Sequence, residues 1–206
     1  MYQSFYSAAV GASAYLSKLS VTSNNLANIN NHGFQPKNVA FSDLINYNLN
    51  DSAEAVTELQ AGDGMRVQRT YSNFGTSAVA MTRSPLDFAI LQDNAFFMVQ
   101  DVGTGEITYT RSGHFHRGEL DGKFYLMTDS NRMVLDANRE PIEVGQIADN
   151  ENAGEDLGAI RQSVALYTFN NPSRLMNVGA NEFAPSAEGA EPILIENPVF
   201  TPGARE

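Results

Sequence analysis

The sequence predicts a mainly β protein with one N-terminal α-helix, in which an antiparallel β-domain is attached to a terminal helix of the coiled-coil type. Three observations support this prediction. Apolar residues near the N-terminus recur at helical spacing. Residues 65–144 instead contain short apolar runs about ten residues apart, broken by Gly, Asn and Asp, which is typical of antiparallel strands. No run of apolar residues approaches the roughly 20 that cross a bilayer.

The first element is a helix predicted from residue 2 to about residue 29. Its apolar positions step alternately by three and four residues, as the a and d positions of a coiled coil do. This apolar seam comprises Tyr2, Phe5, Ala9, Ala12, Leu16 and Leu19, and Leu26 rejoins it. Small residues, among them Ser7, Ala8 and Gly11, occupy the back of the helix, where they would let other helices approach closely.

Lys18 is the only formally charged side chain among residues 1–36. A helix with one face in water normally carries Lys and Glu on that face, so we expect both faces of this helix to be buried. We find no partner for the seam elsewhere in the chain and expect other helices of a polymer to cover it. The alternative is an uncharged, flexible N-terminus.

The helix is expected to end within residues 28–33, because Asn and Gly tolerate the left-handed conformation that closes helices. Residues 1–36 therefore form the first segment, an axial helix with its polar turn. Residues 37–64 form a connecting segment, in which 39–49 could be a short helix or a strand and 51–63 a polar linker.

Residues 65–200 are predicted to form the β-rich domain, followed by a short C-terminal end at 201–206. Within it we expect a loop at 149–158, a strand at 163–169, a turn at 172–179 and a weak strand at 192–200. The core candidates are Phe88, Ile90, Phe96, Val99 and Tyr109.

The composition argues against several classes of function. A formal net charge of -11 opposes the phosphates of nucleic acid and the heads of anionic lipids. The absence of Cys removes disulfides, thiolate nucleophiles and Cys-ligated metals. The first 20 residues lack the basic and continuously apolar regions of a cleaved secretory signal.

No catalytic constellation can be identified from the sequence. His114 and His116 could share one face of a strand as a metal pair, but no third ligand is evident, and a surface pair is the better interpretation. Neither a Gly-x-Ser-x-Gly elbow nor a phosphate-binding loop is present. We therefore expect no enzyme activity, cofactor, metal or small-molecule substrate.

Two ordered blocks and a looser third one carry a family resemblance, and the second block is made of two parts. Residues 21–34 read VTSNNLANINNHGF, residues 85–90 read PLDFAI ahead of Phe96 and Phe97, and residues 109–115 read YTRSGHF. A looser block is LYTFNNP at 166–172, with Leu175, Gly179 and Asn181 after it. Together they resemble the axial proteins of the bacterial flagellar rod and hook, in particular the rod members.

The resemblance implies a structural subunit of the basal-body rod that polymerises through its terminal helix. The implied partners are copies of itself, other axial proteins of rod and hook, and the flagellar export apparatus, which would deliver the chain to the basal body without signal cleavage. Proximal and distal rod types are not distinguished. Members of the family continue past the position of residues 203–206 into a second long helix, so this sequence is either truncated there or naturally short.

Asn24, Asn25 and Asn28 are singled out for assembly, because their amides could fix the register of helices from neighbouring subunits. The alternative is that they cap the helix end. The full set of expected interface residues is Phe5, Ala9, Ala12, Leu16, Leu19, Asn24, Asn25, Leu26, Asn28, Gly33 and Phe34.

There are two alternatives to a rod subunit. One is an autonomous β-rich surface-binding module, either an adhesin or a polysaccharide-binding domain. The other is a hydrolase that uses two convergent carboxylates. Neither accounts for the uncharged helix.

Overall fold

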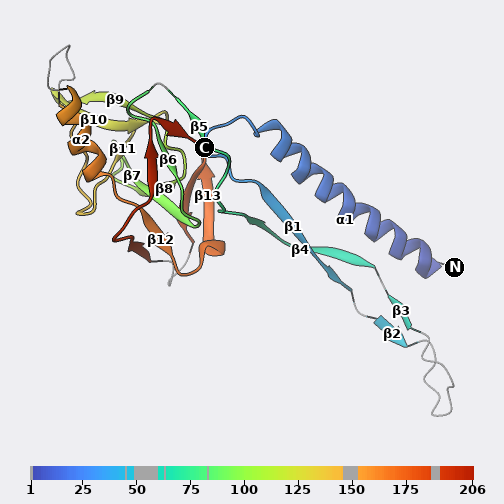
Figure 1. The fold of residues 1–206 in the computed structure, drawn as a ribbon. Coiled ribbons are helices and arrows are strands. Elements are labelled where there is room, and N and C mark those ends of the chain that lie inside the picture. Colours follow the sequence, from blue (N-terminus) through green and yellow to red (C-terminus); the bar gives the residue numbers. More distant parts are fainter. Residues whose placement is uncertain are drawn as a thin grey trace. The chain divides into compact units, whose positions relative to one another are not determined.

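The computed structural model describes residues 2–44, 46–48, 60–62, 64–82, 84–145, 153–186 and 191–206. It confirms the predicted fold class, since an N-terminal helix is followed mostly by antiparallel strands (Figure 1). The chain forms two compact units. Unit 1 comprises residues 1–30 and 36–73, and unit 2 comprises residues 31–35 and 74–206.

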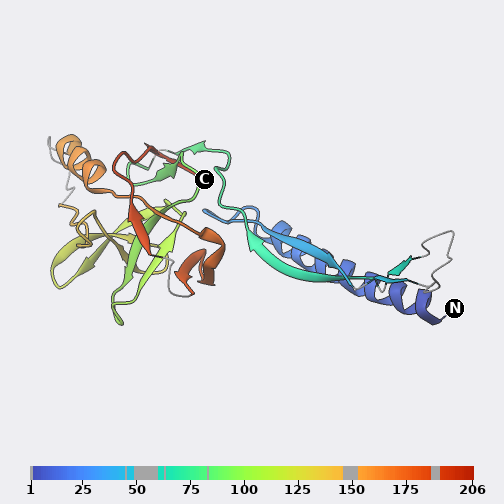
Figure 2. The ribbon, with the colours of Figure 1, turned by 90° about the horizontal axis from the view of Figure 1, so that it is seen from below.

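Unit 1 is a long helix beside a two-stranded ribbon. Helix α1 (Tyr2–Ala27) contacts both β1 (Lys37–Asp43) and β4 (Met65–Ser72), and Figure 2 shows the helix running along the ribbon. The two strands pair antiparallel, with a register shift between Ala40 and Phe41. A β-bulge of this kind increases the local twist of a ribbon.

The helix ends two residues before the predicted limit, in a turn that begins at Asn28. The segment at 39–49, left open between helix and strand, contains most of β1 and all of β2 (Asn46–Asn48). Strand β2 pairs with β3 (Gln60–Gly62), which falls inside the predicted linker at 51–63. The other residues of that linker, 51–59 and 63, lie outside the described part of the chain.

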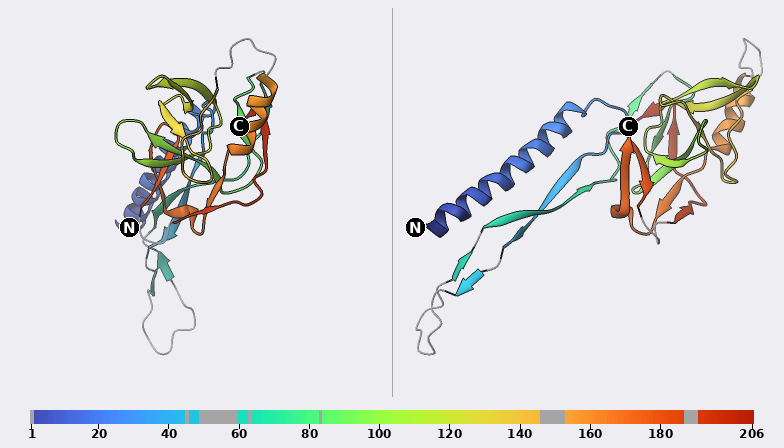
Figure 3. Two further views of the ribbon diagram at one scale, coloured as in Figure 1. Left: turned by 90° about the vertical axis from the view of Figure 1, so that its left-hand side faces the viewer. Right: turned by 180° about the vertical axis from the view of Figure 1, so that it is seen from behind.

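Unit 2 is built on an antiparallel sheet with the strand order β13-β14-β8-β7-β11-β10-β9, and β12 joins β7 on one side and β15 on the other. Figure 3 shows the same strands from two further sides. The strands of this sheet are β7 (Ala95–Asp101), β8 (Ile107–Thr110), β9 (Phe115–Leu120), β10 (Lys123–Thr128), β11 (Arg132–Val134), β12 (Tyr167–Phe169), β13 (Leu175–Gly179), β14 (Glu182–Pro185) and β15 (Pro192–Leu194).

The last residues of the chain add short strands to unit 2. Strand β16 (Phe200–Pro202) pairs with β6 (Phe88–Ile90), and β17 (Ala204–Arg205) pairs with β5 (Ala80–Met81). Residues 201–206 are therefore part of the folded β-structure in this chain.

The five predicted core residues are confirmed, because each is at most 4% exposed. They divide between two clusters. Phe88, Ile90 and Val99 belong to one, and Phe96 and Tyr109 belong to the other. Burying a large apolar side chain stabilises a fold by roughly 1.5–3 kcal/mol. Burial also raises the pKa of the Tyr109 phenol to about 12, so this group stays neutral in the core.

The loop predicted at 149–158 is wrong in its second half, where helix α2 (Ala153–Ser163) begins. The acidic residues and two glycines of this stretch suggested a loop, but Ile160 and the following Val164 pack into the core and favour the helix. The strand predicted from residue 163 consequently starts only at Tyr167.

The turn predicted at 172–179 is also wrong in its second half. A short 3₁₀ helix, η1 (Pro172–Arg174), is followed directly by β13, which pairs with β14. The turn was predicted from Pro172 and Gly179, but these residues mark only the two ends of the segment.

Candidate assembly surface

Helix α1 has two faces with different surroundings. Ala14 is buried, and Val10 and Val21 on the same face are partly covered. Phe5 lies nine residues, about two and a half turns, from Ala14, and therefore points to the opposite side. The ribbon covers only the first of these faces.

The face that the ribbon leaves open carries the predicted seam. Among the large seam residues, Phe5 is 75% exposed, Leu16 66%, Leu19 60% and Leu26 70%. Ala9 and Ala12 lie between them and are exposed as well. The structure thus brings these six predicted interface residues together on one uncharged, apolar stripe.

The packing of the opposite face on the ribbon was missed by sequence reasoning. The rings of Tyr15 and Phe41 lie 5.9 Å apart between centroids, and Nζ of Lys18 lies 5.8 Å from the centroid of Phe41. Lys18, the single charged residue of the helix, is thereby placed beside an aromatic face. Of the two helix faces expected to be buried, the ribbon covers one within this chain, and the seam face is exposed.

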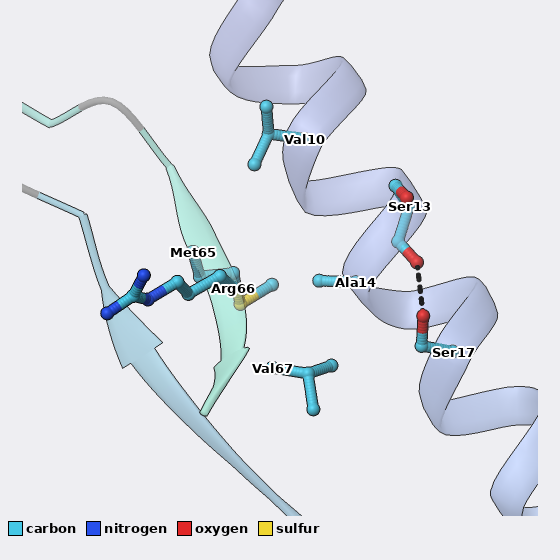
Figure 4. A pocket seen from close by; sticks show the side chains of 7 residues that line it. All are labelled: Val10, Ser13, Ala14, Ser17, Met65, Arg66 and Val67. Atoms are coloured by element: carbon cyan, nitrogen blue, oxygen red, sulfur yellow. Dashed lines mark hydrogen bonds between the residues drawn. The ribbon is translucent and has the colours of Figure 1, made fainter. Parts of the chain in front are cut away.

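A shallow hollow lies between α1 and β4. Val10 and Ala14 point from the helix toward Met65 and Val67 on the strand (Figure 4). Ser13 and Ser17 line it from the helix, where the Ser17 hydroxyl donates to the Ser13 carbonyl at 3.1 Å. Arg66 is the only ionisable side chain in its lining. The hollow therefore lacks the convergent acid and base groups of a catalytic site.

Asn25 fastens the end of the helix to the ribbon. Its Nδ2 donates to the Lys37 carbonyl at 2.8 Å, and its Oδ1 accepts from the Lys37 amide at 3.0 Å. The sequence suggested a bond to another subunit or a cap, but the structure places this amide within unit 1. The signal that could have located it is Pro36, which restricts the preceding residue to an extended conformation and so favours a strand soon after the helix.

The other two singled-out amides lie on the last turn of the helix. Asn28 Nδ2 donates to the Asn24 carbonyl at 2.8 Å, and the Asn28 amide donates to the same oxygen at 3.2 Å. Asn24 itself is exposed. Asn28 thus donates to the Asn24 carbonyl twice, once from its backbone amide in the regular helical pattern and once from its side chain.

Gly33 and Phe34 belong to unit 2. Gly33 has φ of +63°, and a Cβ there would lie 2.4 Å from the amide nitrogen of Ser112. Its own amide donates to the Glu206 carbonyl at 3.4 Å. Phe34 is half-buried. The backbone of this turn is therefore held against the sheet in a conformation that only glycine adopts without strain.

The three histidines of the chain meet in unit 2. Nδ1 of His114 lies 3.0 Å from both carboxylate oxygens of Asp129, and Nδ1 of His116 lies 4.0 Å from one of them. The ring of His32 stacks on that of His114, with 5.4 Å between centroids. Sequence reasoning missed both Asp129 and His32 as neighbours of the pair. Across the described ranges, no three His, Asp or Glu side chains are arranged to hold a metal ion.

A buried ion pair in unit 2 gave no signal in the sequence. Arg111 Nη2 lies 2.8 Å from Glu206 Oε1, with the two side chains 0% and 2% exposed. Arg111 also donates to the carbonyls of Gln92 and Ala95. The partners are 95 positions apart, so only the pairing of the chain's last strands brings them together.

No helix in the described part of the chain is both long and apolar enough to cross a membrane. Helix α1 is long, but Ser, Thr and Asn residues and Lys18 interrupt its apolar residues.

Comparison with known proteins gives a consistent picture. Residues 5–35, which contain most of α1 and the turn after it, match the family described as flagella basal body rod protein. A flagellar basal-body rod protein FlgG of Bacillus subtilis is 30% identical over 206 residues, covering 90% of this chain and 74% of that protein. The FlgG of Caulobacter vibrioides is 27% identical over 90% of this chain and 74% of its own length.

The similarity extends to a hook protein. The flagellar hook protein FlgE of Treponema pallidum is 26% identical over 197 residues, which cover 88% of this chain but 41% of the hook protein. These relatives are structural proteins by name, and none is named as an adhesin or a hydrolase.

Proposed function

Because this chain belongs to the flagellar basal-body rod protein family, we propose that it is a structural subunit of the rod, which polymerises through the seam of α1. Membership of the family makes the chain a structural, axial component of the flagellum.

The exposed seam is the observation that carries this proposal. Phe5, Leu16, Leu19 and Leu26 are each at least 60% exposed on a helix whose one charge lies elsewhere. Burying such side chains between subunits contributes roughly 1.5–3 kcal/mol each, before the cost of association. A contiguous apolar stripe of this kind marks a surface that another protein covers.

The occupants we propose for the seam are helices of identical copies and of other rod and hook subunits. The ribbon covers one face of each helix, and the exposed apolar seam lies on the opposite face. Each helix therefore has one open contact surface. When such a surface meets a different surface of the next subunit and the rotation between subunits does not close a ring, the contact generates an open helical array.

We further propose that the rod of the basal body is the site of action and that the flagellar export apparatus delivers the chain without signal cleavage. This rests on the family and on the N-terminal sequence, which serves as an axial helix. The proposed role is structural and requires no substrate or cofactor.

The test is complementation of a deletion strain. Leu26→Asp places a charge in the seam and should abolish swimming and stop rods early in electron micrographs of basal bodies. The control is Val178→Asp, which places the same charge on a side chain 49% exposed in unit 2. Normal swimming with Leu26→Asp, or complete rods in the deletion strain itself, would refute the proposal.

A further inference from the structure

The cluster formed by His32, His114 and Asp129 is not used by the assembly surface. His32 belongs to residues 31–35, the short stretch of unit 2 that lies in the sequence between two stretches of unit 1. Its ring stacks on His114, with 24° between the ring planes. The stack therefore joins this stretch to the sheet through two imidazole rings.

The same stretch is held by backbone contacts that do not titrate. Asn181 Nδ2 donates to the His32 carbonyl at 2.9 Å, and the Gly33 amide donates to the Glu206 carbonyl. Gly33 also packs closely against the backbone of Ser112. These contacts define where residues 31–35 sit, and the His32 ring is the part of the attachment whose charge depends on pH.

Burial and the nearby positive charges disfavour the protonation of His32. Burial lowers the pKa of His32 below its ordinary value of 6.5, and the charges of Arg205 on β17 and of His114 lower it further. The carboxylates of Asp129, in the β10–β11 turn, and of Asp87, which bridges to His114, act in the opposite direction as smaller contributions. The neutral ring is thus the form that fits the folded arrangement.

His114 has a different environment. Both oxygens of Asp129 lie 3.0 Å from its Nδ1, so a charged His114 ring can be held where it is. A second charge on His32 would then face a charged ring at 5.4 Å, with Arg205 nearby.

We propose that the stacked rings of His32 and His114 form a pH-sensitive latch, which holds residues 31–35 on unit 2 when His32 is neutral and loosens them when both rings are charged. The stabilisation is fully present above about pH 6.5 and is lost as the pH falls through the lowered pKa of His32. The latch is a property of the single chain and does not depend on the proposed function.

Hydrogen exchange of the purified monomer, corrected for intrinsic rates, tests the latch. Between about pH 7.5 and about pH 5, protection of residues 31–35 should fall severalfold, while the buried strand β7 keeps its protection. The charges of Asp93 and Asp101 do not change within this pH range. Hydrogen bonds from Thr76 lower the pKa of Asp93 below 3.8, and those from Thr104 and Gly103 do the same for Asp101, so both stay ionised at about pH 5.

Two matched variants distinguish loss of the latch from a general destabilisation of the fold at low pH. His114→Phe keeps a ring in the stack without its charge and should retain protection at low pH, whereas His116→Phe removes a more exposed histidine outside the stack and should behave like wild type. If His114→Phe does not fold, His32→Phe makes the same test from the other side. Equal protection of wild type at both pH values, or an undiminished loss in the stack variant, would overturn the proposal.

Discussion

The side-chain amide of Asn25 forms two hydrogen bonds with the backbone of Lys37, one to its carbonyl and one from its amide. It thereby occupies the position that a neighbouring strand would take beside the start of β1. Asn25 thereby joins the end of α1 to the start of the ribbon.

Asn25→Leu should loosen that attachment. It leaves the Lys37 amide and carbonyl without their partner, which costs on the order of 1–3 kcal/mol for partly buried groups. We expect faster hydrogen exchange at the start of β1, loss of rod assembly, and an unchanged core in unit 2. Asn24→Leu, at the exposed neighbouring position, is the control for hydrogen exchange. Unchanged exchange in Asn25→Leu would show that the amide does not fix the helix.

Two alanines on opposite faces of α1 should respond differently to the same substitution. Ala14→Asp puts a charge against the ribbon and should detach the helix at a cost of roughly 1–3 kcal/mol or more. Ala12→Asp lies on the exposed seam and should leave the monomer's circular dichroism and urea midpoint nearly unchanged while blocking assembly. The assignment of faces is wrong if the two variants destabilise the monomer equally.

Gly33→Ala should destabilise unit 2. The left-handed backbone alone costs roughly 1–3 kcal/mol for another residue, and the new Cβ would meet the Ser112 backbone. Gly11→Ala is the matched control, because nothing lies within 4 Å of its added Cβ and alanine favours a helix by roughly 0.5–1 kcal/mol. Thermal unfolding of both variants measures the difference. A Gly33→Ala protein as stable as wild type would mean that this turn can move away from the sheet.

The buried pair of Arg111 and Glu206 should contribute strongly to the stability of unit 2. Glu206→Gln leaves a buried guanidinium without its counter-charge, and breaking such a pair typically costs about 3–5 kcal/mol. Lys123→Gln removes an exposed pair with Glu143 and should have little effect on the urea midpoint. Similar midpoints for both variants would contradict a structural role for the buried pair.

The sequence allowed the fold class, the seam and the core of unit 2 to be predicted, because each rests on local periodicity. The five core residues lie on strands whose apolar runs are short and regular. Helix α2 was mistaken for a loop because its glycines and acidic residues outweighed Ile160, a buried side chain that anchors it.

What could not be predicted depends on contacts between distant residues. The packing of α1 on the ribbon, the bonds from Asn25 to Lys37 and the pair of Arg111 with Glu206 all require the register of strands that no local pattern encodes. The same holds for the histidine cluster, since Asp129 reaches His114 only through the pairing of β10 with β9.

The central claim is that the seam of each subunit is covered by other helices in the rod. Thiol accessibility tests this claim most directly. The chain contains no Cys, so a single introduced thiol reports one position. Leu16→Cys should react rapidly with a maleimide in the monomer, where Leu16 is 66% exposed, and should be protected in isolated basal bodies that still form complete rods. Equally rapid labelling of Leu16→Cys in those assembled rods would contradict the account.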